Sequence, residues 1–138
     1  MKVIVCIDDR YGMFFAGRRV SSDKKVTERI ALLAQTNRVW MNEYSAKLFS
    51  NRNGIAVDEE FLDRMEAADY CFIEGTDISG YLGKITGLTV YRWNRRYPSD
   101  TRFPFEEITA DMKLVSREDF EGNSHKRITE ERYVYEEK

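Results

Sequence analysis

The sequence has few of the residues that build metal centres and disulfide frameworks. Its 138 residues include one histidine, two cysteines and two prolines. Zinc sites need several His or Cys ligands at short spacings, so a lone His125 argues against a metal site. Cys6 and Cys71 each lie inside an apolar run, which predicts two buried free thiols and not a disulfide.

Long apolar runs and a large net charge are lacking too. The N-terminal apolar run lasts five residues and ends at Asp8-Asp9, which is too short for a signal peptide, and no stretch approaches a membrane span. We therefore expect a cytoplasmic protein with no membrane partner. A formal net charge of -2 makes nucleic acid an unfavoured partner.

Apolar residues are sufficient for a core, at 42% of the chain, and their spacing predicts alternating strands and helices within a single domain over residues 1–138. The tail differs, because Met112–Val115 and Ile128–Tyr135 are strand-like and separated by a turn at Gly122-Asn123. We predict an α/β fold with a mainly parallel central sheet, flanking helices and an antiparallel C-terminal hairpin edge. The expected elements are strands at 3–7, 38–42, 70–73 and 88–93, helices at 23–35, 43–49, 58–68 and 78–85, and a long loop at 10–20.

Several motifs in this order resemble dihydrofolate reductase. The family has a helix ending in Leu-x-Lys, then a strand, then an Asp-Thr-x-Phe-Pro signature. The matching residues here are Leu82-Gly83-Lys84, Leu88–Tyr91 and Asp100-Thr101-Arg102-Phe103-Pro104. Weaker similarities follow the same order along most of the chain, at Asp9–Met13, Ser22-Asp23, Val39–Met41 and Asn123–His125. The chain looks like a shortened and divergent dihydrofolate reductase.

The resemblance implies a ligand cleft at the carboxyl ends of the strands. Asp23 falls where the family carries its one catalytic carboxylate, which holds the pterin ring and assists its protonation. Tyr91 falls where the family keeps a hydroxyl that bonds to this carboxylate. The expected ligand-binding residues are Cys6, Ile7, Met13, Asp23, Met41, Ser45, Glu74, Gly75 and Tyr91.

Each of these side chains also has a purely structural interpretation. Asp23 lies at the expected start of a helix, where an acid caps the first turn and interacts favourably with the helix dipole. Tyr91 fits the core side of a strand. The apolar run Met13–Phe15 fits either a lid over a ligand or a plug of the core.

The departures from the family bear on the cofactor. The phosphate-binding turn, Gly-Arg-x-Thr in the family, is Asn42-Glu43-Tyr44-Ser45 here, and the glycine-rich second loop is Ile73-Glu74-Gly75. Acids near phosphate positions repel a dinucleotide. The stretch between Phe49 and Tyr70 is also shorter than in the family, which implies the loss of a strand and of the adenine-holding loop. We therefore expect no cofactor, and no ordinary NADPH binding.

Three functions remain open, and the sequence does not decide whether the protein is an enzyme. The first is binding of a small heterocyclic ligand or a protein partner in the residual cleft. The second is a divergent NADPH-dependent reductase of a pterin-like substrate. The third is contact with nucleic acid through the basic and aromatic segment Arg92–Tyr97, helped by Arg18-Arg19.

Overall fold

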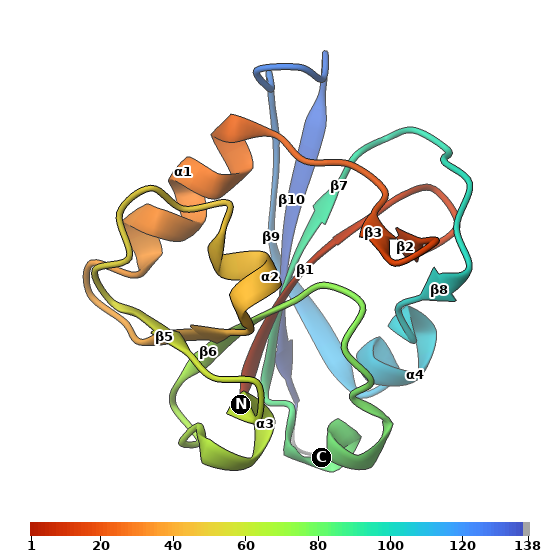
Figure 1. The fold of residues 1–138 in the computed structure, drawn as a ribbon. Coiled ribbons are helices and arrows are strands. Elements are labelled where there is room, and N and C mark those ends of the chain that lie inside the picture. The colour runs from red at the N-terminus through yellow and green to blue at the C-terminus, as the bar shows by residue number, and fades with distance from the viewer. Residues whose placement is uncertain (137–138) are drawn as a thin grey trace.

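A seven-stranded sheet forms the centre of the protein in the computed structural model, which describes residues 1–136 (Figure 1). Its order is β5-β4-β6-β1-β7-β10-β9. The first five of these strands run parallel, whereas β10 is antiparallel to β7 and β9 is antiparallel to β10. This confirms the predicted α/β fold. The strands are β1 (Lys2–Ile7), β4 (Val39–Met41), β5 (Ile55–Val57), β6 (Tyr70–Ile73), β7 (Gly87–Arg92), β9 (Met112–Phe120) and β10 (Ile128–Tyr135).

Both faces of the sheet are covered (Figure 1). One face carries α1 (Lys24–Leu33) and α2 (Glu43–Ala46). The other carries α3 (Phe61–Arg64), the 3-10 helix η1 (Ser79–Lys84) and α4 (Phe105–Thr109). A three-stranded sheet of β3 (Arg18–Arg19), β2 (Gly12–Phe15) and β8 (Thr101–Arg102) lies beside α4. No helix in the described part of the chain is long and apolar enough to cross a membrane.

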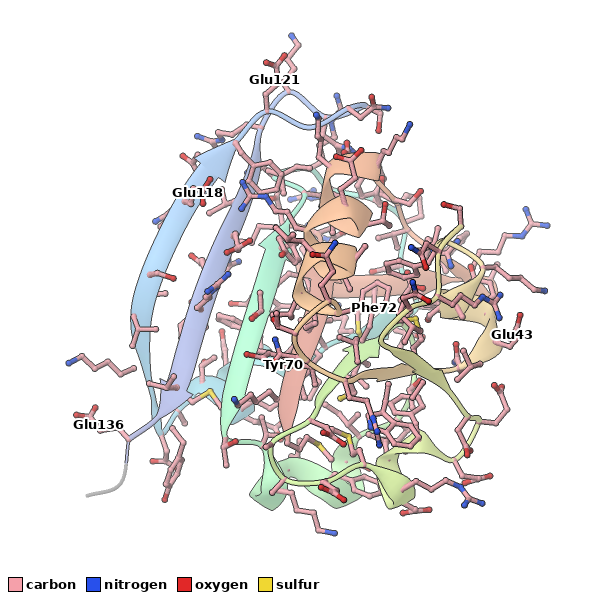
Figure 2. The ribbon with its side chains drawn as sticks, turned by 90° about the vertical axis from the view of Figure 1, so that its left-hand side faces the viewer. Glu43, Tyr70, Phe72, Glu118, Glu121 and Glu136 are labelled. Atoms are coloured by element: carbon pink, nitrogen blue, oxygen red, sulfur yellow. The ribbon has the colours of Figure 1, made fainter. Side chains whose placement is uncertain are left out.

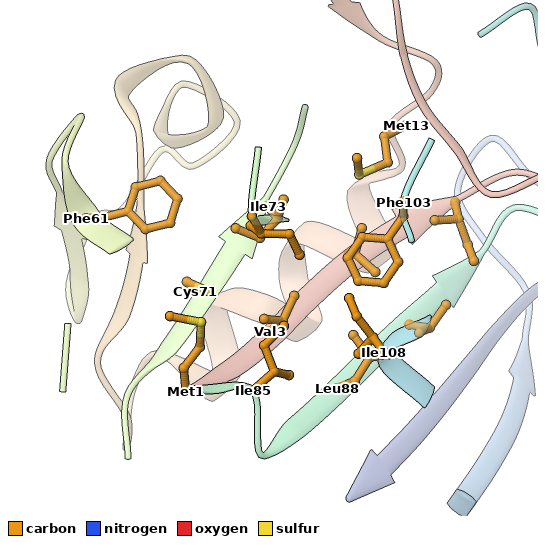
Figure 3. Packing of buried hydrophobic residues seen from close by; sticks show 14 residues of the cluster. Met1, Val3, Met13, Phe61, Cys71, Ile73, Ile85, Leu88, Phe103 and Ile108 are labelled. Atoms are coloured by element: carbon orange, nitrogen blue, oxygen red, sulfur yellow. The ribbon is translucent and has the colours of Figure 1, made fainter. Parts of the chain in front are cut away.

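Alternation along the strands sends side chains into two separate hydrophobic clusters. Successive side chains of a strand point to opposite faces, so Val3 and Ile4 enter different clusters. In the first cluster, Val3, Ile73 and Leu88 pack against Phe103 and Ile108 (Figure 3). In the second, Val26 and Ile30 of α1 pack over Ile4, Phe72 and Trp93. Each face of the sheet therefore has its own core.

Residues 10–20 are a hairpin, so the prediction of a long loop is wrong. Strand β2 pairs with β3 on one side and with β8 on the other. Ala16 and Gly17 join β2 to β3 with positive φ angles of 51° and 77°, as a tight hairpin turn requires. The strands have four, two and two residues, which is too short for apolar alternation to become visible in the sequence.

The short middle segment differs from the prediction as well. It contains an unpredicted edge strand, β5, which pairs in parallel with β4. Gly54 precedes it with φ of 79°, and a Cβ there would lie 1.8 Å from the Ala34 carbonyl oxygen. The helix expected over 58–68 is a single turn, and the one expected over 78–85 is a 3-10 helix. Helix α4 was not expected at all.

Candidate functional site

Asp23 caps α1 and at the same time holds the turn between β9 and β10. Its Oδ1 accepts hydrogen bonds from the backbone N–H groups of Lys25 and Asn123, both at 2.9 Å. Its Oδ2 accepts from the backbone N–H of Ser124 at 2.9 Å and from the Ser124 hydroxyl at 3.2 Å. The start of α1 and this turn meet at the upper end of the molecule (Figure 1). The capping role considered for Asp23 is confirmed.

His125 completes the surroundings of this carboxylate. Its Nδ1 lies 2.8 Å from Asp23 Oδ2. Its Nε2 lies 2.9 Å from the Ser21 hydroxyl and 3.1 Å from the Tyr97 hydroxyl. The imidazole stacks on Trp93 with ring centroids 4.6 Å apart. A side chain of the protein itself thus contacts the carboxylate that, by the resemblance, would hold a pterin ring.

The hydrogen bonds around Asp23 keep it ionised. Burial by itself raises the pKa of this carboxyl group, but the donors Asn123, Ser124, His125 and Lys25 outweigh it and hold the pKa well below its usual range. Tyr91 is not among the hydrogen-bond partners of Asp23 in the described residues. It lies instead opposite Glu130 in the β7–β10 ladder, and burial followed by the charge of Glu130 raises the pKa of Tyr91.

The turn that the resemblance matches to a phosphate site carries carboxylates. Asn42 caps α2 through its Oδ1, which accepts from the Ser45 backbone N–H at 2.9 Å. The backbone N–H of Glu43 donates to the Glu59 carboxylate at 2.9 Å, and the Glu43 carboxylate pairs with Arg52. The Ser45 hydroxyl is fully buried and has no hydrogen-bond partner among the described residues.

The second expected cofactor contact, at the carboxyl end of β6, is occupied by an ion pair. Arg19 from β3 reaches Glu74 through Nε at 2.8 Å and Nη2 at 3.0 Å, and its guanidinium lies 4.3 Å above the Tyr44 ring. Gly75 has φ of 75°, and a Cβ built on it would lie 2.9 Å from the Phe14 ring. The β2–β3 hairpin therefore covers this end of the sheet with its own side chains.

The remaining expected wall residues do not line one cleft. Ile7 and Met13 belong to the cluster beneath β2 and α4, whereas Met41 and Tyr91 belong to the cluster beneath α1, and all four are buried. Met13 thus packs in the core. Cys6 is partly exposed and packs on the α1 side. Both cysteines are free thiols, and burial, reinforced at Cys6 by the charge of Glu74, raises their pKa values.

A groove does exist on the α1 face, away from the expected cleft. It has a volume of about 520 Å³, within the range of ligand pockets, and lies between α1 and the sheet. Tyr70, at the amino end of β6, lies beneath the end of α1 that borders this groove (Figure 2). Tyr91 is the one expected site residue in its wall. The lining residues are Ile4, Arg29, Leu32, Leu33, Thr36, Tyr70, Thr89, Tyr91, Glu130 and Arg132.

Charged groups concentrate at one wall of this groove. Glu130 is 5% exposed and accepts from Arg29 at 2.9 Å and from Arg132 at 3.1 Å. Arg29 also binds Glu118 of β9 at 2.8 Å and lies 3.7 Å above the Phe120 ring. The groove therefore combines leucine and tyrosine surface with a fixed carboxylate and fixed guanidinium groups.

The basic and aromatic segment Arg92–Tyr97 is exposed only in part, at Arg95 and Arg96. Trp93 is 2% exposed and lies against His125. Arg92 pairs with Glu131 at 2.7 Å, and Arg19 of the second basic pair is held by Glu74. Within residues 1–136, no three His, Cys, Asp or Glu side chains gather into a group that could hold a metal ion.

Sequence reasoning missed His125, Ser21 and Trp93 as members of the Asp23 cluster, and Arg29 and Glu130 as the charged wall of the groove. The Asp23 and His125 side chains are 102 residues apart, and no local pattern joins them. The only available signal was the joint resemblance of Ser22-Asp23 and Asn123–His125 to parts of one family.

The sheet order and the two-sided covering define the chain as having the dihydrofolate reductase fold. A scan against family models finds no match, and a search of curated proteins finds none either. Solved structures do match, with 244 similar chains.

One similar structure is dihydrofolate reductase from Enterococcus faecalis, complexed with NADP(H) and RAB-propyl. The TM-score is 0.70, and the match covers 99% of this chain and 96% of that one. The sequence identity is 14%, so the likeness establishes the fold and leaves the activity to be argued from the residues.

Proposed function

We propose that this protein keeps the dihydrofolate reductase fold without ordinary NADPH binding, and that it binds a small heterocyclic ligand on its α1 face. The absence of NADPH binding is supported by one observation. Carboxylates lie at both of the phosphate-contact positions that the resemblance implies. The Glu59 carboxylate accepts the first backbone N–H of α2, and Glu74 is fixed by Arg19 at the end of β6.

Electrostatics and space both act against the cofactor there. A diphosphate brought to the Glu43 N–H would have to displace the Glu59 carboxylate and lie beside a second one on Glu43. At β6, a nicotinamide approaching Gly75 would meet the Phe14 ring, which already lies in contact with that glycine.

The groove between α1 and β10 supports the binding of a heterocyclic ligand. Its volume suits a fused heterocycle, since ligand pockets of about 300–1,000 Å³ are typical. Leu32, Leu33 and Tyr70 provide apolar surface for the ring faces. Glu130 provides an acceptor for ring N–H groups, and Arg29 provides donors for ring oxygens. Two alternatives make other demands. A protein partner would bind at the exposed Leu32, and a pterin reductase would need NADPH as well as the heterocycle.

A thermal-shift panel of pterins, folates, nucleobases, nucleotides and NADPH tests this proposal, because a ligand of the native state raises the melting temperature. We expect a heterocycle without a dinucleotide tail to raise the melting temperature and NADPH to have no effect. The variant Thr36→Trp fills the groove and removes the shift. Gln35→Trp, one residue earlier and outside the groove, retains it. A shift that survives Thr36→Trp, or the absence of any shift, contradicts the ligand site.

A further inference from the structure

Ser21, His125 and Asp23 form a hydrogen-bonded chain that neither the groove nor the lost cofactor site explains. The Ser21 hydroxyl lies 2.9 Å from His125 Nε2, and His125 Nδ1 lies 2.8 Å from Asp23 Oδ2. Asp23 and His125 are buried, whereas Ser21 is partly exposed. A partly exposed serine, a buried imidazole and a buried carboxylate in this order are the arrangement of a serine nucleophile with its base and orienting acid.

The hydrogen-bond directions in this chain suit a general base. An ionised carboxylate only accepts hydrogen bonds, so His125 Nδ1 is the donor to Asp23. The lone pair of Nε2 then faces the Ser21 hydroxyl, the nearer of two hydroxyls at this nitrogen, and can accept its proton. Stacking on Trp93 fixes the plane of the ring. Tyr97 is a second hydroxyl at the same nitrogen, at 3.1 Å.

Donors for a developing oxyanion follow Ser21 along the chain. Ser21 lies two residues before Asp23, the N-cap of the ten-residue helix α1. Within residues 1–136, the backbone N–H groups of Ser22, Asp23 and Lys24 donate no hydrogen bond. Free N–H groups that follow a nucleophile at the start of a helix stabilise negative charge on a tetrahedral intermediate.

We infer that Ser21 is an acyl-accepting nucleophile and that the protein cleaves small esters bearing an anionic group. The Ser21 oxygen bonds to the ester carbonyl carbon while its proton moves to His125 Nε2. The bond from that carbon to the leaving oxygen then breaks, and the leaving alkoxide takes the proton from Nε2. Water repeats the two steps to release the acid and restore Ser21. This inference does not rest on the heterocycle groove.

We deduce the anionic group of the substrate from an arginine-lined pocket that includes Tyr97. Its hydroxyl reaches His125, and the same residue lines a pocket of about 410 Å³ together with Arg10, Arg96 and Arg102. These three guanidinium groups form no ion pair within the described residues, and arginine stays charged at neutral pH. A carboxylate or phosphate bound in this pocket would lie beside Tyr97, whose hydroxyl is 3.1 Å from His125 Nε2.

A fluorophosphonate probe tests the nucleophile directly. The Ser21 oxygen bonds to phosphorus, fluoride leaves, and the proton passes through His125 to solvent. We expect intact-mass spectrometry of the full chain to show one adduct, and peptide mapping to place it on Ser21. Ser21→Ala abolishes the adduct. Ser116→Ala, which removes an exposed hydroxyl of β9 that does not contact Ser21, His125 or Asp23, retains it.

Asp23 serves as a positioning residue, and its test separates orientation from stability. In Asp23→Asn the labelling rate, divided by the folded fraction from circular dichroism, should fall roughly 100-fold or more, because an amide favours the wrong imidazole tautomer. A merely structural role would leave the rate of the folded fraction unchanged. Failure of the native chain to label, or an adduct on any other residue, overturns the inference.

Steady-state hydrolysis tests the substrate class. The hemisuccinate ester of 4-nitrophenol should have about tenfold higher kcat/KM than the acetate ester, as expected of one arginine–carboxylate contact. Arg96→Gln removes this preference, and Arg127→Gln, an exposed arginine outside the pocket, preserves it. Equal values for the two esters on the native protein overturn the anionic substrate class.

Discussion

Asp23 shows how one carboxylate can hold together two distant parts of a chain. It closes the first turn of α1 and also binds three successive residues of the β9–β10 turn, Asn123, Ser124 and His125. Gly122 lets that turn approach, since a Cβ there would lie 2.6 Å from Asp23 Oδ2. The capping half of this role was predictable from Ser22-Asp23 at the start of an apolar periodicity. The other half depends on tertiary contact and left no local pattern.

Replacing Asp23 with Asn should destabilise the protein by about 1–3 kcal/mol, because buried donors lose a charged acceptor. Urea unfolding followed by circular dichroism measures the change. Asp9→Asn is the control, since Asp9 is exposed and should change stability by less than about 0.5 kcal/mol. Equal stability of Asp23→Asn and the native chain would contradict the stabilising role of Asp23 between α1 and the β9–β10 turn.

The same residue predicts how stability depends on pH. The folded pKa of Asp23 is depressed, so its contribution is fully present above the unfolded pKa of about 3.9 and is lost as the pH falls towards the folded pKa. The free energy of unfolding should therefore decrease below about pH 5, and the decrease should be smaller in Asp23→Asn. Urea midpoints measured from pH 6 down to pH 2 check this, and parallel curves for the two proteins would refute it.

Among the elements, α1 is fastened to the C-terminal hairpin by Arg29. Its guanidinium binds Glu118 of β9 and the buried Glu130 of β10. Arg29→Leu should lower the free energy of unfolding by about 2–4 kcal/mol. The loss is smaller than for a buried carboxylate left without any partner, because Arg132 still pairs with Glu130. Arg52→Leu breaks the exposed pair with Glu43 and should cost at most about 1 kcal/mol.

A second change separates charge burial from packing in this contact. Glu130→Gln added to Arg29→Leu removes the partly uncompensated carboxylate and should recover part of the lost stability. Chemical unfolding of the four proteins of this cycle supplies the coupling energy. A double variant that loses the sum of the two single losses would mean that the two side chains act independently.

Gly75 joins the β2–β3 hairpin to the end of β6. Gly75→Ala should destabilise by about 1–3 kcal/mol, because φ is 75° and the new methyl group would lie 2.9 Å from the Phe14 ring. Gly80→Ala is a matched control, since a Cβ there has nothing within 4 Å. Thermal unfolding with equal melting temperatures for the two variants would show that the hairpin does not press on Gly75.

Long periodic elements were predictable, and short ones were not. The strands β1, β6 and β7 and the helix α1 carry clear apolar patterns, and the structure has them where the sequence predicts them. Strands β3 and β8 have two residues each, which is too short for an apolar pattern. They are defined by their pairing with β2. Helix α4 follows Pro104 and is five residues long, which is too short for a helical period to appear.

For the whole molecule, the parallel sheet with its antiparallel edge followed from the alternation of strands and helices, but the arrangement of the site did not. The resemblance grouped Ile7, Met13, Met41 and Tyr91 into one cleft, whereas the structure divides them between two faces of the sheet. A similar order of motifs specifies topology. Whether a cavity remains depends on side-chain packing, such as Phe14 on Gly75 and His125 on Trp93.

For this protein with the dihydrofolate reductase fold, we propose that its own side chains stand where the resemblance implies cofactor contacts. Isothermal titration calorimetry with NADPH tests it most directly, with the Enterococcus faecalis enzyme, known as a complex with NADP(H), as the positive control. The account predicts no binding heat for this chain at micromolar concentrations of NADPH. A dissociation constant in the micromolar range or below would contradict it and would favour a divergent NADPH-dependent reductase.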